Sequence, residues 1–413
     1  MRANWRIGSL FGIPLYINSS WFVILAFVTL VNANDVNAME LSGLSPALGW
    51  LTGLGMALLL FTSVLLHELG HSLVARSQGI TVNSITLFLF GGIASIERES
   101  KTPSEAFSVA IAGPMVSLVL CGLFFALTTL SQSLPLLEFL ASDLAKINLV
   151  IALFNLIPGL PLDGGQVLKA IVWKISGDRF TGVRWASASG QLLGTLGISF
   201  GLLLVLLTGE IGAIWLSLIG WFVLQNAKAY NRLTLIQQSL LELTAADAMS
   251  RDFRVVNANL TLREFIEEYI ISQLGLGISQ TYYAASEGRY RGLLRVSQIQ
   301  LMERSEWDNK HLIDIVHPLT EIASVQEKTP LVQVVKTLDT IKDPFLTVLS
   351  LAGAVAGVID RADVIQAIAA HNKLSIPEAE IKRIKAEKTY PSYLQLGAIA
   401  KTLVPQDYAQ TQK

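Results

Sequence analysis

The stretch LGWLTGLGMALLLFTSVLLHELGH, residues 48–71, decides how this chain folds. It has no charged residue from Leu48 to Leu66, and about 20 apolar residues suffice for a helix to cross the hydrocarbon core of a bilayer. The run ends on His67-Glu-Leu-Gly-His71, and histidines four residues apart share one helix face, at a spacing that lets both bind one Zn²⁺. Glu68 between them can act as a general base. Ionisable groups in such a place are costly and therefore indicate a functional site.

Composition divides the chain into two parts. Of its 413 residues, 52% are hydrophobic and 15% are charged, and the long apolar runs lie almost entirely before about residue 230. We therefore expect a membrane domain over 1–232, a soluble domain over 244–371 and a charged C-terminal tail over 372–413. The tail is expected to begin with a solvated amphipathic helix over 377–388. The net charge of −1 gives no reason to expect a direct nucleic-acid partner. The single cysteine, Cys121, excludes an intramolecular disulfide.

The membrane domain is predicted to contain about six spans in the lipid bilayer. Their approximate limits are 15–34, 48–75, 105–130, 144–173, 187–208 and 211–228. Of the loops and ends that flank these spans, only alternate ones contain basic residues, namely Arg2, Arg6, Arg76, Arg98, Lys101, Lys174, Arg179, Arg184, Lys228 and Arg232. The other loops carry no Lys or Arg and contain acids such as Asp35, Glu40, Glu138 and Glu210. By the positive-inside rule, this asymmetry predicts a multi-pass protein of the cell (inner) membrane with both termini cytoplasmic.

A β-rich segment, residues 81–96, separates the second and third predicted spans. It contains the turn signal Gly91-Gly92 and is too short and too broken by glycine to cross a bilayer. It is either a hairpin partly sunk in the membrane, where protein or water must cover its backbone, or an ordinary cytoplasmic hairpin. The sequence leaves both possibilities open. The acids Glu97 and Glu99 beside it are interpreted as a solvated face.

The fourth predicted span carries the pattern NLIPGLPLDGG, residues 155–165. Two prolines and three glycines predict that this helix breaks near its middle, which allows a carboxylate to project into a protected cavity. Asp163 is the only acid between Asp143 and Asp178. It is a candidate third metal ligand, and it is also a candidate N-cap of the helix that follows the break.

Together, HELGH in a span, a Gly-Gly β segment and NxxPxxPxDGG in a later broken span resemble the site-2 proteases, which are intramembrane zinc metalloproteases. The resemblance implies that His67, His71 and Asp163 bind one Zn²⁺ and that Glu68 is the catalytic base. It also implies that the carboxamide of Asn155 stabilises the oxyanion or holds the substrate, with capping of the helix break as the alternative.

The substrate implied by this resemblance is a transmembrane protein, such as a membrane-anchored regulator. Since a helix hides its carbonyls in hydrogen bonds, the substrate must unwind before it is cut. A β-edge near residues 88–96 could receive the unwound strand.

The soluble part contains two units at a spacing of roughly 65 residues, each with short β-rich runs around an amphipathic helix. The first comprises 253–256, 262–271, 282–285 and 292–299, and the second comprises 321–324, 331–338, 345–348 and 357–364. The β-α-β-β-α order and the ending G-h-h-x-x-x-D-h resemble a tandem pair of CBS domains, at about 244–317 and 318–371. The predicted fold is therefore a polytopic α-helical membrane domain with a short β-rich segment, followed by an α+β cytoplasmic CBS-pair domain.

CBS pairs often bind adenine nucleotides, and Asp363 occupies the place of the aspartate that can bind ribose in that family. The first repeat has Gln298 at this place, and Asp360 replaces the usual Ser/Thr in the second. Two interpretations stay open: an adenine nucleotide at the pair, or a structural role that includes a homodimer formed through the CBS domains.

Three functions are compared for the whole chain. The leading hypothesis is a zinc-dependent intramembrane endopeptidase for regulated intramembrane proteolysis, with a CBS module that regulates access. The alternatives are a catalytically inactive homologue that binds membrane proteins and a CBS-regulated transporter. The intact Glu68 argues against the first alternative. The convergence of ionisable residues on one motif and one broken helix argues against the second.

Overall fold

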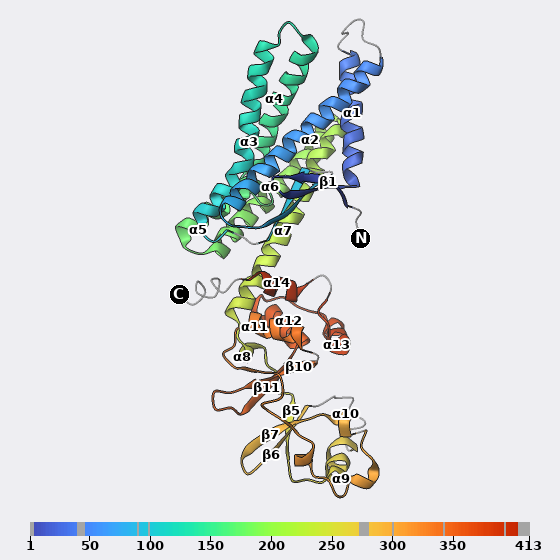
Figure 1. The fold of residues 1–413 in the computed structure, drawn as a ribbon, viewed down its shortest axis with the longest axis vertical. Coiled ribbons are helices and arrows are strands. Elements are labelled where there is room, and N and C mark those ends of the chain that lie inside the picture. Colours follow the sequence, from blue (N-terminus) through green and yellow to red (C-terminus); the bar gives the residue numbers. More distant parts are fainter. Residues whose placement is uncertain are drawn as a thin grey trace. The chain divides into compact units, whose positions relative to one another are not determined.

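The computed structural model describes residues 4–38, 46–88, 91–97, 100–271, 281–299, 301–341, 343–391 and 394–403. The chain forms two compact units, Met1–Thr234 and Leu235–Lys413 (Figure 1). Some residues named above lie outside the described residues: Arg2, Glu40, Arg98, Glu99, Leu89-Phe90 at the tip of the β-rich segment, and the end of the tail from 404.

A four-stranded sheet opens the first unit. Its strands are β1 (Asn4–Leu10), β2 (Ile13–Asn18), β3 (Val82–Phe88) and β4 (Gly91–Ile96), in the order β1-β2-β3-β4. β2 runs parallel to β3, and the other two pairs are antiparallel. The predicted β-rich segment is therefore present as the β3–β4 pair. The two N-terminal strands were missed.

The start of the first predicted span was wrong. Residues 15–18 belong to β2, in which buried and half-buried positions alternate, and this pattern is typical of a strand. Helix α1 (Ser20–Ala38) begins only after Asn18, whose side-chain oxygen accepts a hydrogen bond from the Ser20 backbone N–H. A polar cap thus separates the strand from the apolar helix.

The other helices of this unit are α2 (Pro46–Ser77), α3 (Pro103–Leu130), α4 (Pro135–Asn155), α5 (Asp163–Ser176), α6 (Arg179–Thr208) and α7 (Ile214–Glu242), with the short 3₁₀ turn η1 (Ile211–Ala213). Among the described residues, three helices are long and apolar enough to cross a membrane: Gly49–Ser77, Pro103–Leu130 and Arg179–Thr208. By length and apolar composition, six spans are not confirmed. The fourth predicted span is divided between α4 and α5, and α7 continues beyond its apolar part.

The predicted helix break is present between Asn155 and Asp163, where α4 ends and α5 begins. The start of α5 contacts the backbone of the break directly, without side chains between them. A Cβ on Gly164 would lie 2.2 Å from the Leu156 carbonyl oxygen, and one on Gly165 would lie 2.3 Å from the Leu160 backbone nitrogen. No side chain fits at either point, so the glycines let the start of α5 pack directly on the break. This contact fixes the first residues of α5.

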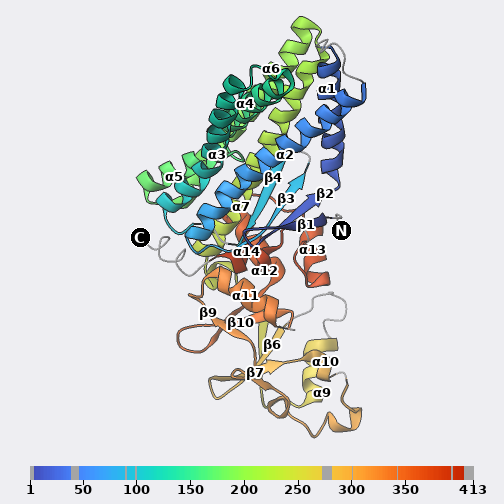
Figure 2. The ribbon, with the colours of Figure 1, turned by 45° about the horizontal axis from the view of Figure 1, so that its top comes forward.

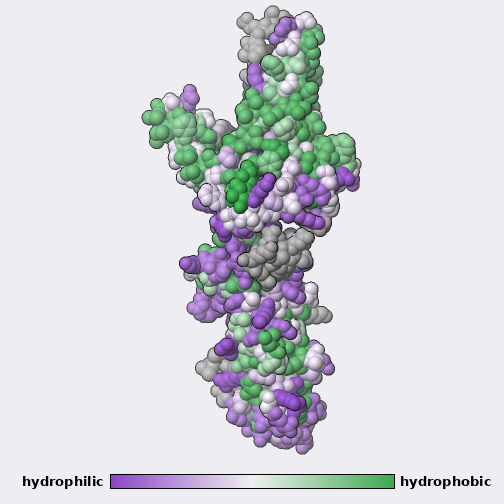
Figure 3. Space-filling view, turned by 90° about the vertical axis from the view of Figure 1, so that its left-hand side faces the viewer, coloured by the Kyte–Doolittle hydropathy of each residue, from purple (hydrophilic) through white to green (hydrophobic). Residues whose placement is uncertain are grey.

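Helix α2 is the centre of the first unit. The sheet packs on it, and Leu69 and Ala75 of α2 share a core with Leu15 and Ile85 of the sheet (Figure 2). α2 also contacts α1, α3 and α4. The part of the surface formed by the long helices is mostly hydrophobic in Figure 3, as expected for side chains that face lipid rather than water.

The second unit repeats one topology. The first repeat contains β5 (Phe253–Asn257), α9 (Leu262–Phe265) continued by η2 (Ile266–Ile270), β6 (Thr281–Ser286), β7 (Arg289–Leu294) and α10 (Val296–Ile299). The second contains β9 (Ser324–Gln326), α11 (Leu331–Thr340), β10 (Phe345–Leu349), β11 (Val355–Asp360) and α12 (Arg361–His371). In each repeat the first two strands are parallel and the third is antiparallel.

Two details of this unit differ from prediction. Strand β9 begins at Ser324, so most of the expected strand 321–324 is not β structure. A further strand, β8 (His317–Pro318), extends the first sheet to the order β5-β6-β7-β8. The helix α8 (Ala245–Ala248) and the 3₁₀ turns η4 (Arg304–Glu306) and η5 (Leu312–Asp314) complete the described elements here.

The described part of the C-terminal tail is folded rather than solvated. It forms α13 (Glu378–Glu387), close to the expected amphipathic helix, and α14 (Leu396–Thr402), which was not expected. Ile381 and Ile384 of α13 are buried, and α14 packs on α11 with Leu396 fully buried.

Candidate metal centre

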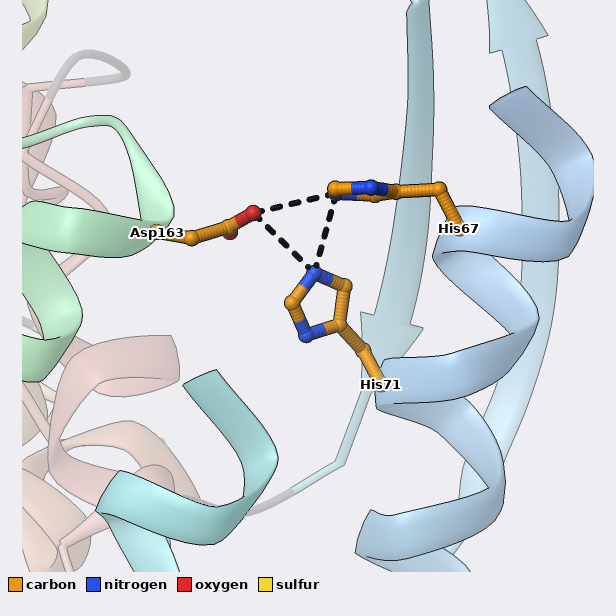
Figure 4. Close-up of side chains that lie close together, drawn as sticks. All are labelled: His67, His71 and Asp163. Carbon is orange, nitrogen blue, oxygen red and sulfur yellow. Dashed lines mark hydrogen bonds and ion pairs between the residues drawn. The ribbon is translucent and has the colours of Figure 1, made fainter. Parts of the chain in front are cut away.

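Two histidines and one aspartate converge in the first unit (Figure 4). His67 and His71 project from successive turns of α2 and are 3% and 8% exposed. Asp163, the first residue of α5, approaches from the opposite side, and its Oδ2 lies 3.0 Å from His67 Nε2 and 3.3 Å from His71 Nε2. The position before the helix is occupied by Leu162, and no side chain caps it. Asp163 therefore faces the imidazoles instead of acting as the N-cap.

The hydrogen bond at His71 Nδ1 determines whether Nε2 of the same ring has a free lone pair. His71 Nδ1 lies 2.7 Å from the Val109 carbonyl oxygen, which can only accept, so Nδ1 donates. In the neutral ring Nε2 then carries a lone pair, and it faces an acceptor oxygen of Asp163 at 3.3 Å and His67 Nε2 at 3.3 Å. Lone pairs do not face each other at this distance unless a cation, either a proton or a metal ion, lies between them.

The spacing of the three donor atoms fits zinc. In a tetrahedral site with Zn–N bonds of about 2.0–2.1 Å, two donor atoms lie about 3.3 Å apart. The separations here are 3.0, 3.3 and 3.3 Å. Two imidazole nitrogens and one carboxylate oxygen are also a donor set typical of catalytic zinc, which keeps its fourth position open. Among the described residues, these three are the group that could hold a metal ion.

Glu68 lies between the two histidines in sequence and next to strand β4 in space. A Cβ on Gly92 would lie 2.4 Å from Glu68 Cγ, so only glycine fits beside this side chain. The carboxylate is half-buried, and it forms no hydrogen bond or ion pair with any described residue. Its lone pairs are therefore available to a water molecule or a substrate.

Asn155 is the last residue of α4 and is half-buried. Within the described part of the chain its carboxamide makes no hydrogen bond, so the structure offers no capping contact for it. Nor does it bond to the three converging side chains. The position that ends the helix belongs to Leu156, whose backbone N–H bonds to carbonyls of α4.

Helix α3 also contributes to the site, and this contribution was not predicted from the sequence. His67 Nδ1 lies 2.9 Å from Ser117 Oγ, and Ser117 is fully buried. Gly113 lies against both imidazoles, since a Cβ there would be 2.2 Å from His71 Nε2. The only signal in the sequence was Gly113-Pro114 in an apolar run, and such a pair is common in membrane helices.

The side chain of Asp363 takes part in a capping motif at the start of α12. Its Oδ2 accepts the Asp360 backbone N–H at 3.0 Å, while Asp360 Oδ1 accepts the backbone N–H groups of Ala362 and Asp363. The two carboxylates thus form a closed capping box at the start of α12. Lys385 Nζ of α13 lies 3.9 Å from both carboxylates. Burial, followed by the charge of Asp360, raises the pKa of Asp363 to about 6.

This capping box leaves little room for a phosphate at the start of α12. The N–H groups that could receive a phosphate already bond to Asp360, and the adjacent carboxylates would repel an anion. The predicted contact of Asp363 with a ribose concerns another part of the nucleotide and stays a prediction.

Most of the chain is similar to known proteins. The sequence profile of peptidase family M50 matches residues 55–146 and 135–193. A Synechocystis protein with the provisional name zinc metalloprotease is 43% identical over 372 residues, which cover 89% of this chain and 96% of the relative. The site-2 protease of Methanocaldococcus jannaschii is 28% identical in a structural match that covers 56% of this chain and 96% of that chain, with a TM-score of 0.39.

A match to another solved structure concerns a smaller part of the chain. The CBS domain of a bacterial CNNM/CorC family Mg²⁺ transporter, solved in complex with ATP, is 20% identical over 33% of this chain and 94% of that chain. Its TM-score is 0.26.

Proposed function

Because the chain belongs to peptidase family M50, we propose that it is a zinc-dependent intramembrane protease that hydrolyses peptide bonds within or near the transmembrane segments of membrane proteins. The convergence of His67 Nε2, His71 Nε2 and Asp163 Oδ2, at separations suited to tetrahedral zinc, supports this function most directly. The position of all three in an apolar unit supports cleavage within the bilayer.

In this proposal His67, His71 and Asp163 hold one Zn²⁺ per chain. When bound, the ion supplies Lewis-acid chemistry, which polarises a carbonyl and makes a water molecule more acidic. Glu68 accepts the proton of the attacking water on its carboxylate and delivers it to the nitrogen of the departing amine. Asn155, whose carboxamide has no partner among the described residues, holds the substrate backbone near the scissile bond.

Strand β4 provides the substrate with a place to unwind. It is the last strand in the order β1-β2-β3-β4, and no described strand pairs with its outer edge. Gly92 of β4 lies against Glu68, so a segment paired with this edge would pass close to the catalytic base. An extended segment of a transmembrane substrate, such as a membrane-anchored regulator, adds to this edge by main-chain hydrogen bonds.

The membrane topology belongs to the same proposal. About six passes through the cell (inner) membrane, with both termini cytoplasmic, agree with the basic residues in alternate loops between the apolar segments. Three of these passes correspond to the long apolar helices α2, α3 and α6. HELGH then lies toward the cytoplasmic end of α2.

We further propose that the second unit is a tandem CBS pair. The two repeats share one strand topology, and a buried hydrogen bond of 2.7 Å between Tyr283 Oη of β6 and Thr347 Oγ1 of β10 joins them. The closed capping box at Asp360 favours a structural or homodimerising role over nucleotide binding at α12. Through this role the pair controls access of substrates to the protease unit.

The decisive experiment compares the purified full-length protein with its Glu68→Gln variant. Both are expected to bind one zinc per chain by metal analysis, because Glu68 is not among the three converging donors. Only the wild type should cleave single-span membrane proteins in detergent or liposomes. Equal cleavage by both forms would overturn the proposed mechanism, and a wild type that binds no zinc would overturn the metal assignment. A titration with ATP tests the CBS pair, and the structural role predicts an unchanged cleavage rate.

A further inference from the structure

We propose that α3, which supplies none of the three donor side chains, positions the metal centre through Ser117 and Gly113. Ser117 is a positioning residue that holds His67 in its metal-binding tautomer. Gly113 keeps open the space in front of the two imidazoles. This inference rests on the proposed zinc site and extends it to residues outside the HELGH and NxxPxxPxDGG motifs.

The register of α3 supports this role. Val109, Gly113 and Ser117 are four residues apart, so they lie on one face of the helix. Val109 contributes its carbonyl oxygen to His71 Nδ1 at 2.7 Å, and Ser117 contributes its hydroxyl to His67 Nδ1 at 2.9 Å. One helix thus contacts the outer nitrogen of both histidines, with the glycine midway between the two contacts.

The Ser117 hydroxyl can accept the Nδ1 proton of His67 and so hold the ring in the tautomer that binds a metal through Nε2. A neutral imidazole carries its proton on one nitrogen only, and the partner of the other nitrogen fixes the choice. When the Ser117 hydroxyl accepts a hydrogen bond from Nδ1–H, Nε2 keeps its lone pair toward Asp163. Ser117 is 0% exposed, so water cannot readily replace it. Loss of such an outer partner typically weakens metal binding about 10–100-fold.

Gly113 acts through the absence of a side chain. A Cβ at this position would lie 2.2 Å from His71 Nε2 and 2.6 Å from His67 Nε2. These values are close to a metal–nitrogen bond of about 2.0–2.1 Å. A methyl group at this point would therefore occupy the space that an ion bound to both nitrogens needs.

Close packing of α3 on α2 holds these contacts in register. A Cβ on Gly70 of α2 would lie 2.8 Å from Val116 Cγ2 and 3.0 Å from the Ala112 carbonyl oxygen. The helices therefore approach closely between the two histidines. Neither helix can turn about its axis without breaking this contact, so the hydroxyl of Ser117 stays opposite His67.

The first test measures the zinc affinity of the full-length protein by competition with a chelator. Ser117→Ala is expected to weaken zinc binding about 10–100-fold, and Ser117→Thr, which keeps a hydroxyl, should recover most of the affinity. Ser187→Ala is the matched control, because Ser187 is equally buried, on α6, and bonds to neither histidine. With Co²⁺ in place of zinc, the visible spectrum should change in Ser117→Ala and stay unchanged in the control.

The second test replaces Gly113 with alanine. Its zinc content should fall below about a tenth of the wild-type value, whereas Gly122→Ala on the same helix should retain one zinc per chain, because no atom lies within 4 Å of a Cβ there. If Gly113→Ala does not fold, the Ser117 variants decide. A zinc affinity in Ser117→Ala within twofold of the wild type, or normal zinc binding by folded Gly113→Ala, would overturn the inference.

These outcomes separate the role of α3 from the protease function. If the wild type binds zinc and cleaves substrates while the Ser117 variants keep full affinity, the inference about α3 fails and the protease function stands. If Ser117→Ala weakens zinc binding but the wild type cleaves no membrane protein, the positioning role stands and the protease function fails. A wild type without zinc affinity overturns both.

Discussion

Replacement of Gly92 by alanine should separate catalysis from metal binding. The added Cβ would lie 2.4 Å from Glu68 Cγ and 3.1 Å from Cδ, whereas carbon atoms in contact prefer about 3.5–4.0 Å. Relief of this overlap requires the Glu68 carboxylate to move by about 1 Å, and a misplacement of that size costs about 100-fold in rate. The three nearest atoms to the new Cβ all belong to Glu68, so zinc binding should not change.

The assay is cleavage of a single-span substrate by the purified Gly92→Ala protein, with its zinc content measured in the same preparation. We expect kcat to fall about 100-fold while one zinc per chain is retained. Gly55→Ala on α2 is the control, because a Cβ there meets no atom within 4 Å. A kcat within threefold of the wild type would refute the role of Glu68 as a base positioned against β4. A rise in KM with unchanged kcat would indicate that Gly92 serves substrate pairing alone.

Three further predictions concern both units. Removal of zinc by a chelator should abolish cleavage and leave a protein that regains activity on addition of Zn²⁺, and activity that survives metal removal would refute the zinc site. Tyr283→Phe should destabilise the second unit by about 1–3 kcal/mol in denaturant unfolding of the full-length chain, because the buried Thr347 hydroxyl loses its partner; an unchanged midpoint would contradict this. Burial and Asp360 raise the pKa of Asp363 from 3.8 to about 6, with Lys385 Nζ 3.9 Å away. A raised carboxyl pKa means that the contribution of Asp363 to stability is fully present below about pH 4 and is lost as pH rises through about 6. The protection of α12 peptides against hydrogen exchange, corrected for the intrinsic exchange rate at each pH, should therefore fall over this interval in the wild type and stay constant in Asp363→Asn, and identical corrected profiles would refute the assignment.

The donor atoms of the metal centre were predictable from sequence because their signals are local. His67 and His71 are related by helix periodicity, and Asp163 stands out as an acid beside a break that prolines and glycines impose. Ser117 was not predictable, since a serine in an apolar run is common and only the packing of α3 on α2 places it opposite His67. A contact between distant segments leaves no periodic trace in a single sequence.

The same distinction explains the other successes and failures. The β-α-β-β-α order of the second unit follows from alternation and turn residues, and the structure repeats it twice. Strands β1 and β2 were missed because β2 leads directly into the apolar helix α1, so that one hydrophobic run conceals a change of secondary structure at Asn18. Helix α14 was missed because only its contact with α11 buries it.

The metal centre combines three helices, and each is fixed by a different physical constraint. α2 places both imidazoles by its own periodicity. α5 is held at its first residue by Gly164, which packs on the backbone of the break with no room for a methyl group, so Asp163 cannot shift without moving the whole helix. α3 fixes the outer nitrogens of the histidines from a third direction. All three constraints come from backbone packing and buried hydrogen bonds within the protein. The packing of the fold therefore holds the donor atoms close to zinc-binding geometry. Such preorganisation lets the chemistry of the site depend on small displacements of Glu68, whose carboxylate forms no hydrogen bond or ion pair with a described residue.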